Sequence, residues 1–421
     1  MLKDAASLFA NLIQKNNGIG IIRFDQDAYP PNDPTYGGMA ITKVLHDGFG
    51  DATRNTALST IAAHGAHGDT SIGDGLAMAR TQLNGLPAGS YDNKAILLLT
   101  DGLENTPLWI SDVSSSIDSQ TFAVGLGNEN QVNTKALQQV AGGTGGYLLL
   151  SGLLSSSLDD QFRLRKFFLQ ILAGVTNTSI VKDPVGYVNG GSLVRIPFQL
   201  SEADINCRVI LLDEFPVVKL SIETPGGKII DAANAASFGV TFDTSTRIKT
   251  ARFNLPVAFQ AHKVQAGTWY ARLEIDEQEF RRYLTDAKDA NQGALAGLKA
   301  KGAGYCLSVH SFSNLKMTAG VSQSGFSPGA TLCLRASLSE YTLPVVARAT
   351  VRAELEYPDQ TKTVIALQET TPAIHSASLT APIPGIYRFR FVAEGGTYRG
   401  VPFTREQLAN KTICAGSLPA C

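Results

Sequence analysis

The sequence predicts an α/β domain with a mainly parallel sheet, followed by two all-β sandwich domains. Residues 1–176 alternate short apolar runs with amphipathic helical stretches, a pattern typical of a sheet covered by helices. From residue 177 onward, short runs of alternating polar and apolar residues are separated by Pro and Gly turns. The chain has 421 residues, which at roughly 150 residues per domain fits three domains.

Four nearly all-apolar runs predict strands that are buried on both faces. They are Ile19–Phe24, Ala95–Thr100, Thr121–Leu126 and Tyr147–Leu150. Apolar residues at helical spacing predict helices over residues 2–14, 72–83, 110–117, 137–141 and 160–175. Because strands and helices alternate, the sheet of this domain is expected to be mainly parallel.

The domain boundaries follow from the changes in pattern. The α/β domain is expected to cover residues 1–176, and the first sandwich residues 177–284. A polar, Ala-rich and weakly helical stretch predicts a linker over residues 285–304. The second sandwich, of immunoglobulin or fibronectin type, is expected over residues 305–400, with a C-terminal tail over residues 401–421.

Composition excludes several classes of partner. Lys and Arg total 36 against 37 Asp and Glu, so no overall positive field favours nucleic acid. No apolar run reaches the 18 or so residues that would span a bilayer. Asp4 and Asn11 interrupt the first residues, which are therefore interpreted as a helix and not as a signal peptide.

The five cysteines all lie in the second half of the chain and form no CxxC pair that would suggest a zinc site. Cys414 and Cys421 could close a small terminal loop in an oxidising compartment, whereas buried thiols are at least as plausible for Cys207, Cys306 and Cys333. Cysteine usage therefore leaves the compartment open.

A series of motifs in the first domain carries a family likeness. GIGIIRFDQDA at residues 18–28, HGDTSIGDGLAMA at 67–79 and AILLLTDGLEN at 95–105 are followed by TFAVGLGNE at 121–129 and GGTGGYLLL ending at 150. Together they resemble a von Willebrand factor A (VWA) domain over about 150 residues. The resemblance implies a Rossmann-like α/β fold.

The resemblance also implies a metal-ion-dependent adhesion site built from three loops at the carboxyl end of the sheet. Thr70 matches the second of these loops and Asp101 matches the third. Hydroxyl and carboxylate oxygens are the ligands that Mg²⁺ prefers, and Ca²⁺ or Mn²⁺ could take its place in a complete domain. One coordination position would remain open for the carboxylate of a partner.

The first loop of that site, a DxSxS, should follow a strand ahead of residue 2, so the sequence predicts a sheet that lacks its first strand. Metal binding by this chain is then expected to be weak or absent. The strands Ile19–Phe24 and Ala95–Thr100 are expected to face each other across a gap of roughly 10 Å. Open strand edges favour aggregation.

Other motifs are interpreted as structural. The literal DxSxS at Asp112, Ser114 and Ser116 follows no buried strand and lies on a predicted helix, so it is rejected as the metal loop. Residues 325–329 fit GxSxG, but a strand and not a helix follows them. His64 and His67 lack further ligands at matching spacing. Without a catalytic constellation, the chain is not expected to be an enzyme.

The leading hypothesis is a non-enzymatic, adhesion-type binding protein, whose VWA head recognises a protein or matrix ligand through an acidic residue. Its expected location is extracellular or at the cell surface. An alternative is the C-terminal part of a protein resembling the calcium-activated chloride channel regulator family, with a metallohydrolase domain upstream. A third possibility is a purely structural module. No HExxH occurs in this sequence.

Overall fold

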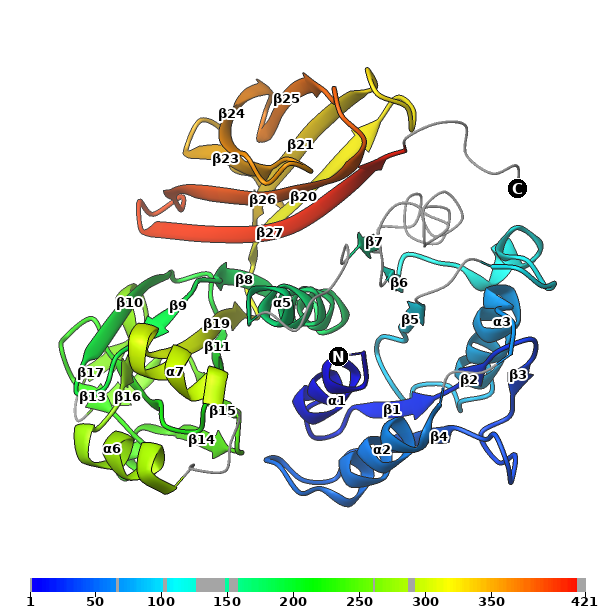
Figure 1. The fold of residues 1–421 in the computed structure, drawn as a ribbon. Coiled ribbons are helices and arrows are strands. Elements are labelled where there is room, and N and C mark those ends of the chain that lie inside the picture. Colours follow the sequence, from blue (N-terminus) through cyan, green and yellow to red (C-terminus); the bar gives the residue numbers. More distant parts are fainter. Residues whose placement is uncertain are drawn as a thin grey trace.

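The computed structural model describes residues 2–65, 68–100, 104–125, 148–150, 158–259, 262–286 and 292–414. Figure 1 shows three parts, which we call the α/β region (residues 2–175), the first β unit (179–311) and the second β unit (315–413). The described part combines helices with a large, mostly antiparallel sheet system.

The α/β region carries the helices α1, α2, α3 and α5, a short 3-10 helix η1, and the strands β1 to β7. The helices are Leu2–Leu12, Ala52–Ala63, Ile72–Asn84 and Leu158–Val175, with η1 at Ile110–Ser116. The strands are Gly18–Ile21, Arg23–Phe24, Ala28–Tyr29, Met39–Lys43, Ile96–Thr100, Thr121–Gly125 and Leu148–Leu150. The predicted helix over residues 137–141 lies outside the described residues.

The sheet of the α/β region is divided, which corrects the prediction of one mainly parallel sheet. Strands β5, β6 and β7 form a three-stranded parallel sheet, as their apolar sequences predict. The predicted strand Ile19–Phe24 instead splits into β1 and β2, and β1 pairs antiparallel with β4. A cavity of about 670 Å³ lies between β1 and β5 and is lined by backbone and apolar side chains of both strands.

Helix α5 connects the three parts of the molecule, and this position explains its apolar sequence. Residues 167–173 are buried without interruption. Phe168 packs with Phe122 of β6, and Leu169 belongs to the same core cluster as Ile210 of the first β unit. Gln170 accepts a hydrogen bond from the backbone of Leu408 in the second β unit. An ordinary surface helix has one apolar face, whereas α5 is apolar on several faces because it packs against three parts of the molecule.

The first β unit buries its core between two sets of antiparallel strands. The smaller sheet runs β10, β18, β12, β13, with bounds Leu193–Leu200, Gly267–Glu274, Lys219–Glu223 and Ile229–Ile230. The other set runs in the order β14 (Val240–Thr244), β15 (Ile248–Asn254), β11 (Asn206–Asp213), β19 (Ala303–Ser311) and β8 (Ser179–Lys182). Strand β9 (Val185–Val188) also pairs with β19. Trp269 is fully buried and stacks on Phe253 at 5.1 Å. The unit also contains a hairpin of β16 (Val257–Phe259) and β17 (His262–Val264) and the short 3-10 helix η2 (Ala235–Phe238). Two helices complete it, α6 (Glu277–Asp286) and α7 (Gln292–Lys301).

The second β unit extends the same sheet through the pairing of β8 with β27. Its strands β20 to β27 are Leu315–Gln323, Thr331–Glu340, Leu343–Pro344, Ala349–Glu356, Lys362–Thr371, Ile374–Thr380, Gly385–Gly396 and Pro402–Ile413. Buried side chains of these strands share one core, which includes Phe389, Phe391 and Phe403.

Two predicted boundaries are wrong. Residues 401–421 were expected to form a tail, yet β27 pairs with β26 along twelve residues. The predicted linker 285–304 contains α7, whose Leu295 and Leu298 are buried in the first β unit. Strand β19 also belongs to the first β unit, because it pairs with β11 and β8.

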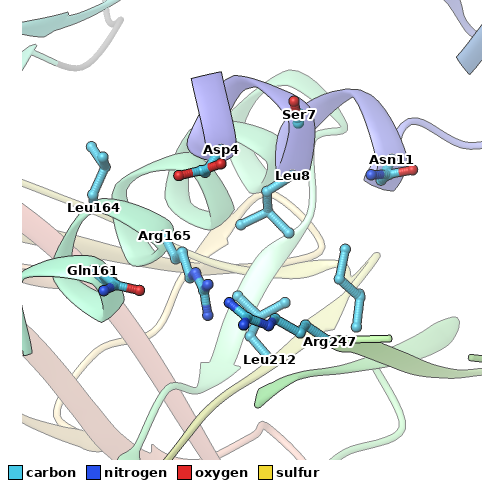
Figure 2. A pocket seen from close by; sticks show the side chains of 10 residues that line it. Asp4, Ser7, Leu8, Asn11, Gln161, Leu164, Arg165, Leu212 and Arg247 are labelled. Carbon is cyan, nitrogen blue, oxygen red and sulfur yellow. The ribbon is translucent and has the colours of Figure 1, made fainter. Parts of the chain in front are cut away.

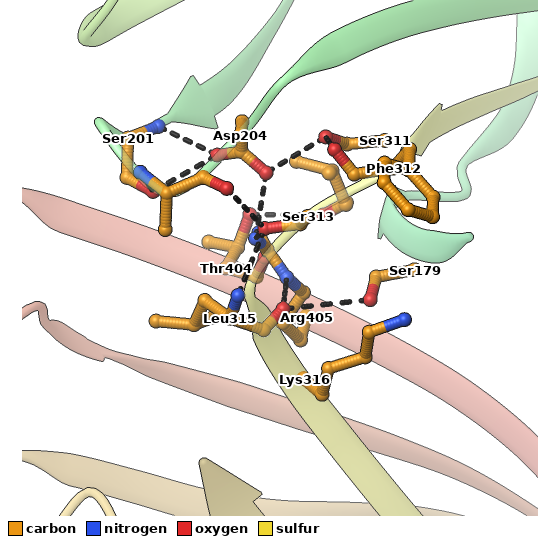
Figure 3. Close-up of polar contacts among 12 residues, drawn as sticks. Ser179, Ser201, Asp204, Ser311, Phe312, Ser313, Leu315, Lys316, Thr404 and Arg405 are labelled. Atoms are coloured by element: carbon orange, nitrogen blue, oxygen red, sulfur yellow. Dashed lines mark hydrogen bonds and ion pairs between the residues drawn. The ribbon is translucent and has the colours of Figure 1, made fainter. Parts of the chain in front are cut away.

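A buried ion pair joins the two β units (Figure 3). Arg405 of β27 and Asp204, in the turn between β10 and β11, are 1% and 0% exposed, and their N–O distance is 2.7 Å. Ser311 and the backbone N–H of Ser201 donate to the carboxylate of Asp204, and Arg405 donates to the carbonyl of Leu315. Burial opposes ionisation of Asp204, but Arg405 and these donors hold its pKa below the ordinary value.

Two thiols are buried in the first β unit. Burial raises the pKa of Cys207 well above its ordinary value and that of Cys306 to about 12, so both stay protonated at neutral pH. In the described part of the chain, no helix is long and apolar enough to cross a membrane.

Replacing Asp204 by Ala is expected to destabilise the protein by about 3 to 5 kcal/mol, because the guanidinium of Arg405 would stay buried without its charged partner. Denaturant unfolding measures this loss. The exposed pair of Arg352 and Glu394 provides the control, and Arg352→Ala should cost less than about 1 kcal/mol. Equal effects of the two substitutions would contradict the structural role given to Asp204.

His310 is expected to make the protein less stable as the pH falls. It is buried in β19, and burial lowers its pKa from 6.5 to about 3. Between these values the unfolded chain binds a proton that the folded chain excludes, so stability decreases below pH 6.5 by at most about 1.4 kcal/mol per unit. His310→Asn should flatten the dependence of unfolding free energy on pH between about 6.5 and 4.5. If the unfolding free energy of wild type and of His310→Asn changes equally with pH, His310 does not cause the dependence.

Candidate functional site

Thr70 lies directly ahead of α3 and is tied to the segment that follows β5. Its backbone N–H donates to the side-chain oxygen of Asn105 at 2.7 Å, and its carbonyl accepts from the N–H of Asn105 at 3.1 Å. Asp101, the other predicted metal ligand, lies outside the described residues. The structure therefore fixes Thr70 against the loop that begins with Asp101 in the sequence.

Ser71, and not Thr70, is the N-cap of α3. Serine and threonine are both favoured at the N-cap of a helix. In the structure the hydroxyl of Ser71 accepts from the N–H of Asp74 and donates to its carboxylate at 2.8 Å. The side chain of Thr70 is consequently not required to cap the helix.

Asp25 is a carboxylate of this site that the sequence motifs did not single out. It directly follows β2, is 4% exposed, and its carbonyl accepts from the N–H of Ser71 at 2.6 Å. The hydroxyl of Tyr29 donates to its carboxylate at 2.7 Å, and this bond raises the pKa of Tyr29 to about 12. The sequence signal that could have identified Asp25 is its position immediately after an apolar run, which is also the position of Asp101.

Glu104 provides a second connection between the β5 loop and α3. Its carboxylate accepts from the N–H of Gly73 at 3.2 Å and from that of Ile110 at 2.9 Å. Burial raises its pKa above the ordinary value. A carboxylate at a helix N-terminus compensates N–H groups that have no partner within the helix. Glu104 thus holds the start of α3 against the start of η1.

Two glycines of α3 allow this close approach. A Cβ atom at Gly73 would lie 2.4 Å from the carbonyl oxygen of Leu108, and one at Gly75 would lie 2.8 Å from the ring of Phe24. Real Cβ atoms essentially never come so close, so larger residues would push the segments apart. The IGDG sequence therefore packs α3 directly against β2 and the loop after β5.

We call Asp25, Thr70, Ser71, Glu104 and Asn105 the loop cluster. Exposed aromatic side chains occur on the segments that flank it. Trp109 is 37% exposed, and its backbone N–H donates to the carboxylate of Asp112 in the first turn of η1. Tyr36 is also 37% exposed, and the guanidinium of Arg23 lies 4.9 Å from its ring centre. Exposed aromatic side chains on a rigid frame are typical of recognition surfaces.

The rejected motifs have structural positions. Asp112, Ser114 and Ser116 lie on η1, whose Ile110 and Val113 are buried. A helix was predicted there, although it is a 3-10 helix and not an α-helix. Ser327 lies in a turn ahead of β21, and His64 follows the end of α2 with its Nδ1 against the carbonyl of Thr60. His67 lies outside the described residues.

The described residues do not by themselves form a metal site. Mg²⁺ needs a near-octahedral shell of oxygen ligands. In the described part, no group of three His, Cys, Asp or Glu side chains could hold an ion, and Thr70 supplies only a neutral hydroxyl. One carboxylate oxygen of Asp25 is already bonded to Tyr29.

Comparison with known proteins gives only distant likenesses. No protein-family model and no curated protein sequence matches the chain. Among solved structures, a von Willebrand factor type A protein from Catenulispora acidiphila resembles it with a TM-score of 0.33 and 12% identity, over 80% of this chain and 59% of that one.

Two further structures are similarly distant. A DUF4785 family protein from Legionella pneumophila has a TM-score of 0.32 and 13% identity, over 56% of this chain and 62% of that one. A Bacillus licheniformis lipase in propeptide form has a TM-score of 0.33 and 10% identity, over 82% of this chain and 85% of that one. The chain thus spans less than two thirds of the first two structures. Likeness at this level assigns neither an activity nor a ligand.

We expect this chain to bind Mg²⁺ weakly or not at all, because Thr70 and Asp101 would leave most of the coordination shell to water. Calorimetric titration with MgCl₂ measures the affinity. Asp101→Ala and Thr70→Ala should then change little, and Thr70→Ala should also leave stability nearly unchanged, since Ser71 caps α3. Tight Mg²⁺ binding that Asp101→Ala abolishes would contradict this expectation.

Proposed function

We propose that this chain is a non-enzymatic binding protein that recognises a protein ligand with the loop cluster and its flanking aromatic residues. The observation that carries the proposal is the network connecting Asp25, Thr70 and Ser71 with Glu104 and Asn105. These bonds fix three loops, from separate parts of the sequence, in one arrangement. A fixed surface loses little conformational entropy on binding.

The chemistry of the flanking residues supports a polypeptide as ligand. Trp109 and Tyr36 offer large rings with few rotatable bonds, and Arg23 provides a positive charge beside Tyr36. Arg23 is 13% exposed and lies 4.0 Å from the carboxylate of Asp25, so a carboxylate of the partner would share this arginine with Asp25. An acidic protein or matrix ligand therefore suits this surface, and no metal ion is needed to account for that preference.

The two β units are proposed to carry the recognition surface, not to catalyse a reaction. The most deeply buried ion pair of these units, Asp204 with Arg405, is used in structural bonds. Helix α5 packs against both units and against β6, so the α/β region is held by a buried contact and not by a flexible linker. This rigid connection between the α/β region and the β units favours a binding role.

Selection of peptides from a displayed random library on the immobilised protein tests the proposal. We expect acidic peptides whose binding decreases at least tenfold in Trp109→Ala, since an aromatic anchor contributes about 2 kcal/mol or more. Asn105→Ala should also weaken the binding of these peptides, because it removes the side-chain oxygen that accepts from the N–H of Thr70.

Tyr341→Ala is the matched control, since Tyr341 is an exposed aromatic residue of the second β unit. It should leave the affinity of the selected peptides unchanged. Peptides that bind Trp109→Ala and wild type equally would place recognition elsewhere. If selection yields no peptide that distinguishes the variants, the purely structural module is favoured.

A further inference from the structure

A second cavity, of about 260 Å³, lies where α1 and α5 meet the strands β11 and β15 (Figure 2). Four separate parts of the sequence supply its walls, and none of its residues belongs to the loop cluster. The lining residues are Asp4, Ser7, Leu8, Asn11, Gln161, Leu164, Arg165, Leu212, Arg247 and Ile248.

Two arginines dominate the charge of this cavity. Arg165 extends from α5, and Arg247 from the turn between β14 and β15. Figure 2 shows their guanidinium groups lying beside each other in the cavity. Burial lowers the pKa of Arg165, and the neighbouring charge of Arg247 acts in the same direction. Two adjacent positive groups repel each other, so this arrangement favours an anion between them.

The carboxylates of Asp4, Asp213 and Glu214 act on this pair electrostatically, but in the described part of the chain none of them forms a direct ion pair with it. Within the described ranges, neither guanidinium forms an ion pair or a side-chain hydrogen bond; the contact of Arg165 is with the ring of Phe162 at 5.7 Å. The nearby Asp213 pairs with Lys249, and Glu214 accepts from the backbone of Gly304. Both acids thus have other partners, although the charge of Asp213 still acts on Arg165 and that of Glu214 acts on both arginines.

The remaining lining determines what the arginines can bind. Leu8, Leu164 and Leu212 are buried and form an apolar floor, which strengthens charge interactions by excluding water. Ser7 and Asn11 line the cavity on the α1 side, and Figure 2 shows the hydroxyl of Ser7 directed away from the two arginines. Asp4 is the one carboxylate among the lining residues, so two positive charges face one negative charge. The cavity is therefore basic.

We propose that this cavity binds a small dianion of the phosphate class through Arg165 and Arg247. Guanidinium groups present paired N–H donors that match the oxygens of phosphate. A volume of about 260 Å³ is smaller than a typical pocket for a drug-sized molecule, so it suits an inorganic anion or a small phosphorylated group.

Binding at this position would join the two regions that form the cavity. Arg165 belongs to the α/β region, whereas Arg247 belongs to the first β unit. An anion that contacts both would stabilise their association and raise the melting temperature, because a ligand of the folded state shifts the unfolding equilibrium. The site thus makes the stability of the protein depend on phosphate.

The test is calorimetric titration of the full chain with inorganic phosphate, with ionic strength held constant by NaCl. We expect Arg165→Gln and Arg247→Gln each to weaken binding about tenfold or more, because each removes a charge-assisted bond. Asp4→Asn should strengthen binding severalfold by removing a repulsive charge. Arg399→Gln, an exposed arginine ahead of β27, should leave affinity unchanged although it alters net charge equally.

Thermal unfolding with and without phosphate provides a second readout on the same variants. Arg247 is exposed in a turn, so Arg247→Gln keeps the test valid if Arg165→Gln fails to fold. The proposal is overturned by a wild-type protein that does not bind phosphate, or by an equal loss in Arg399→Gln. Equal affinity for succinate would overturn the preference for phosphate, and weaker succinate binding would support it.

Discussion

The buried pair of Asp204 and Arg405 constrains the rest of the molecule. Two charges removed from water are tolerated only when every remaining donor and acceptor is satisfied. Here the serines at 201, 311 and 313 and the carbonyl of Leu315 supply these bonds. The groups come from both β units, so the network fixes β27 beside the first unit. That position in turn gives α5 a surface to pack against.

Both proposed binding surfaces depend on helices held by such fixed partners. The loop cluster is ordered around the start of α3, where Glu104 and Asp25 bond to backbone N–H or side-chain groups of neighbouring loops. The arginine cavity is formed against α5, whose other faces are buried. In each case a rigid interior leaves a few polar groups directed toward a partner. The polar groups proposed to bind a ligand therefore lie at junctions between parts of the chain.

Several elements could be predicted because their signals are local. The parallel strands β5 and β6 and the helices α3 and α5 follow from apolar runs and helical spacing. Helix α2 was missed because its sequence has no apolar face. It forms because Asp51 caps it and Arg54 bonds to the carbonyls of Ile13 and His46. These contacts lie outside the helix and leave no periodic pattern.

The sequence by itself determined the types of most elements, the change from helices to strands near residue 177, and the position of Thr70 ahead of a helix. Only the tertiary structure decided that β27 belongs to a sheet, that Ser71 caps α3, and that Arg165 and Arg247 meet in one cavity. The reason is physical. Periodicity and capping preferences act over a few residues, whereas strand partners and charge pairs join positions far apart in the chain.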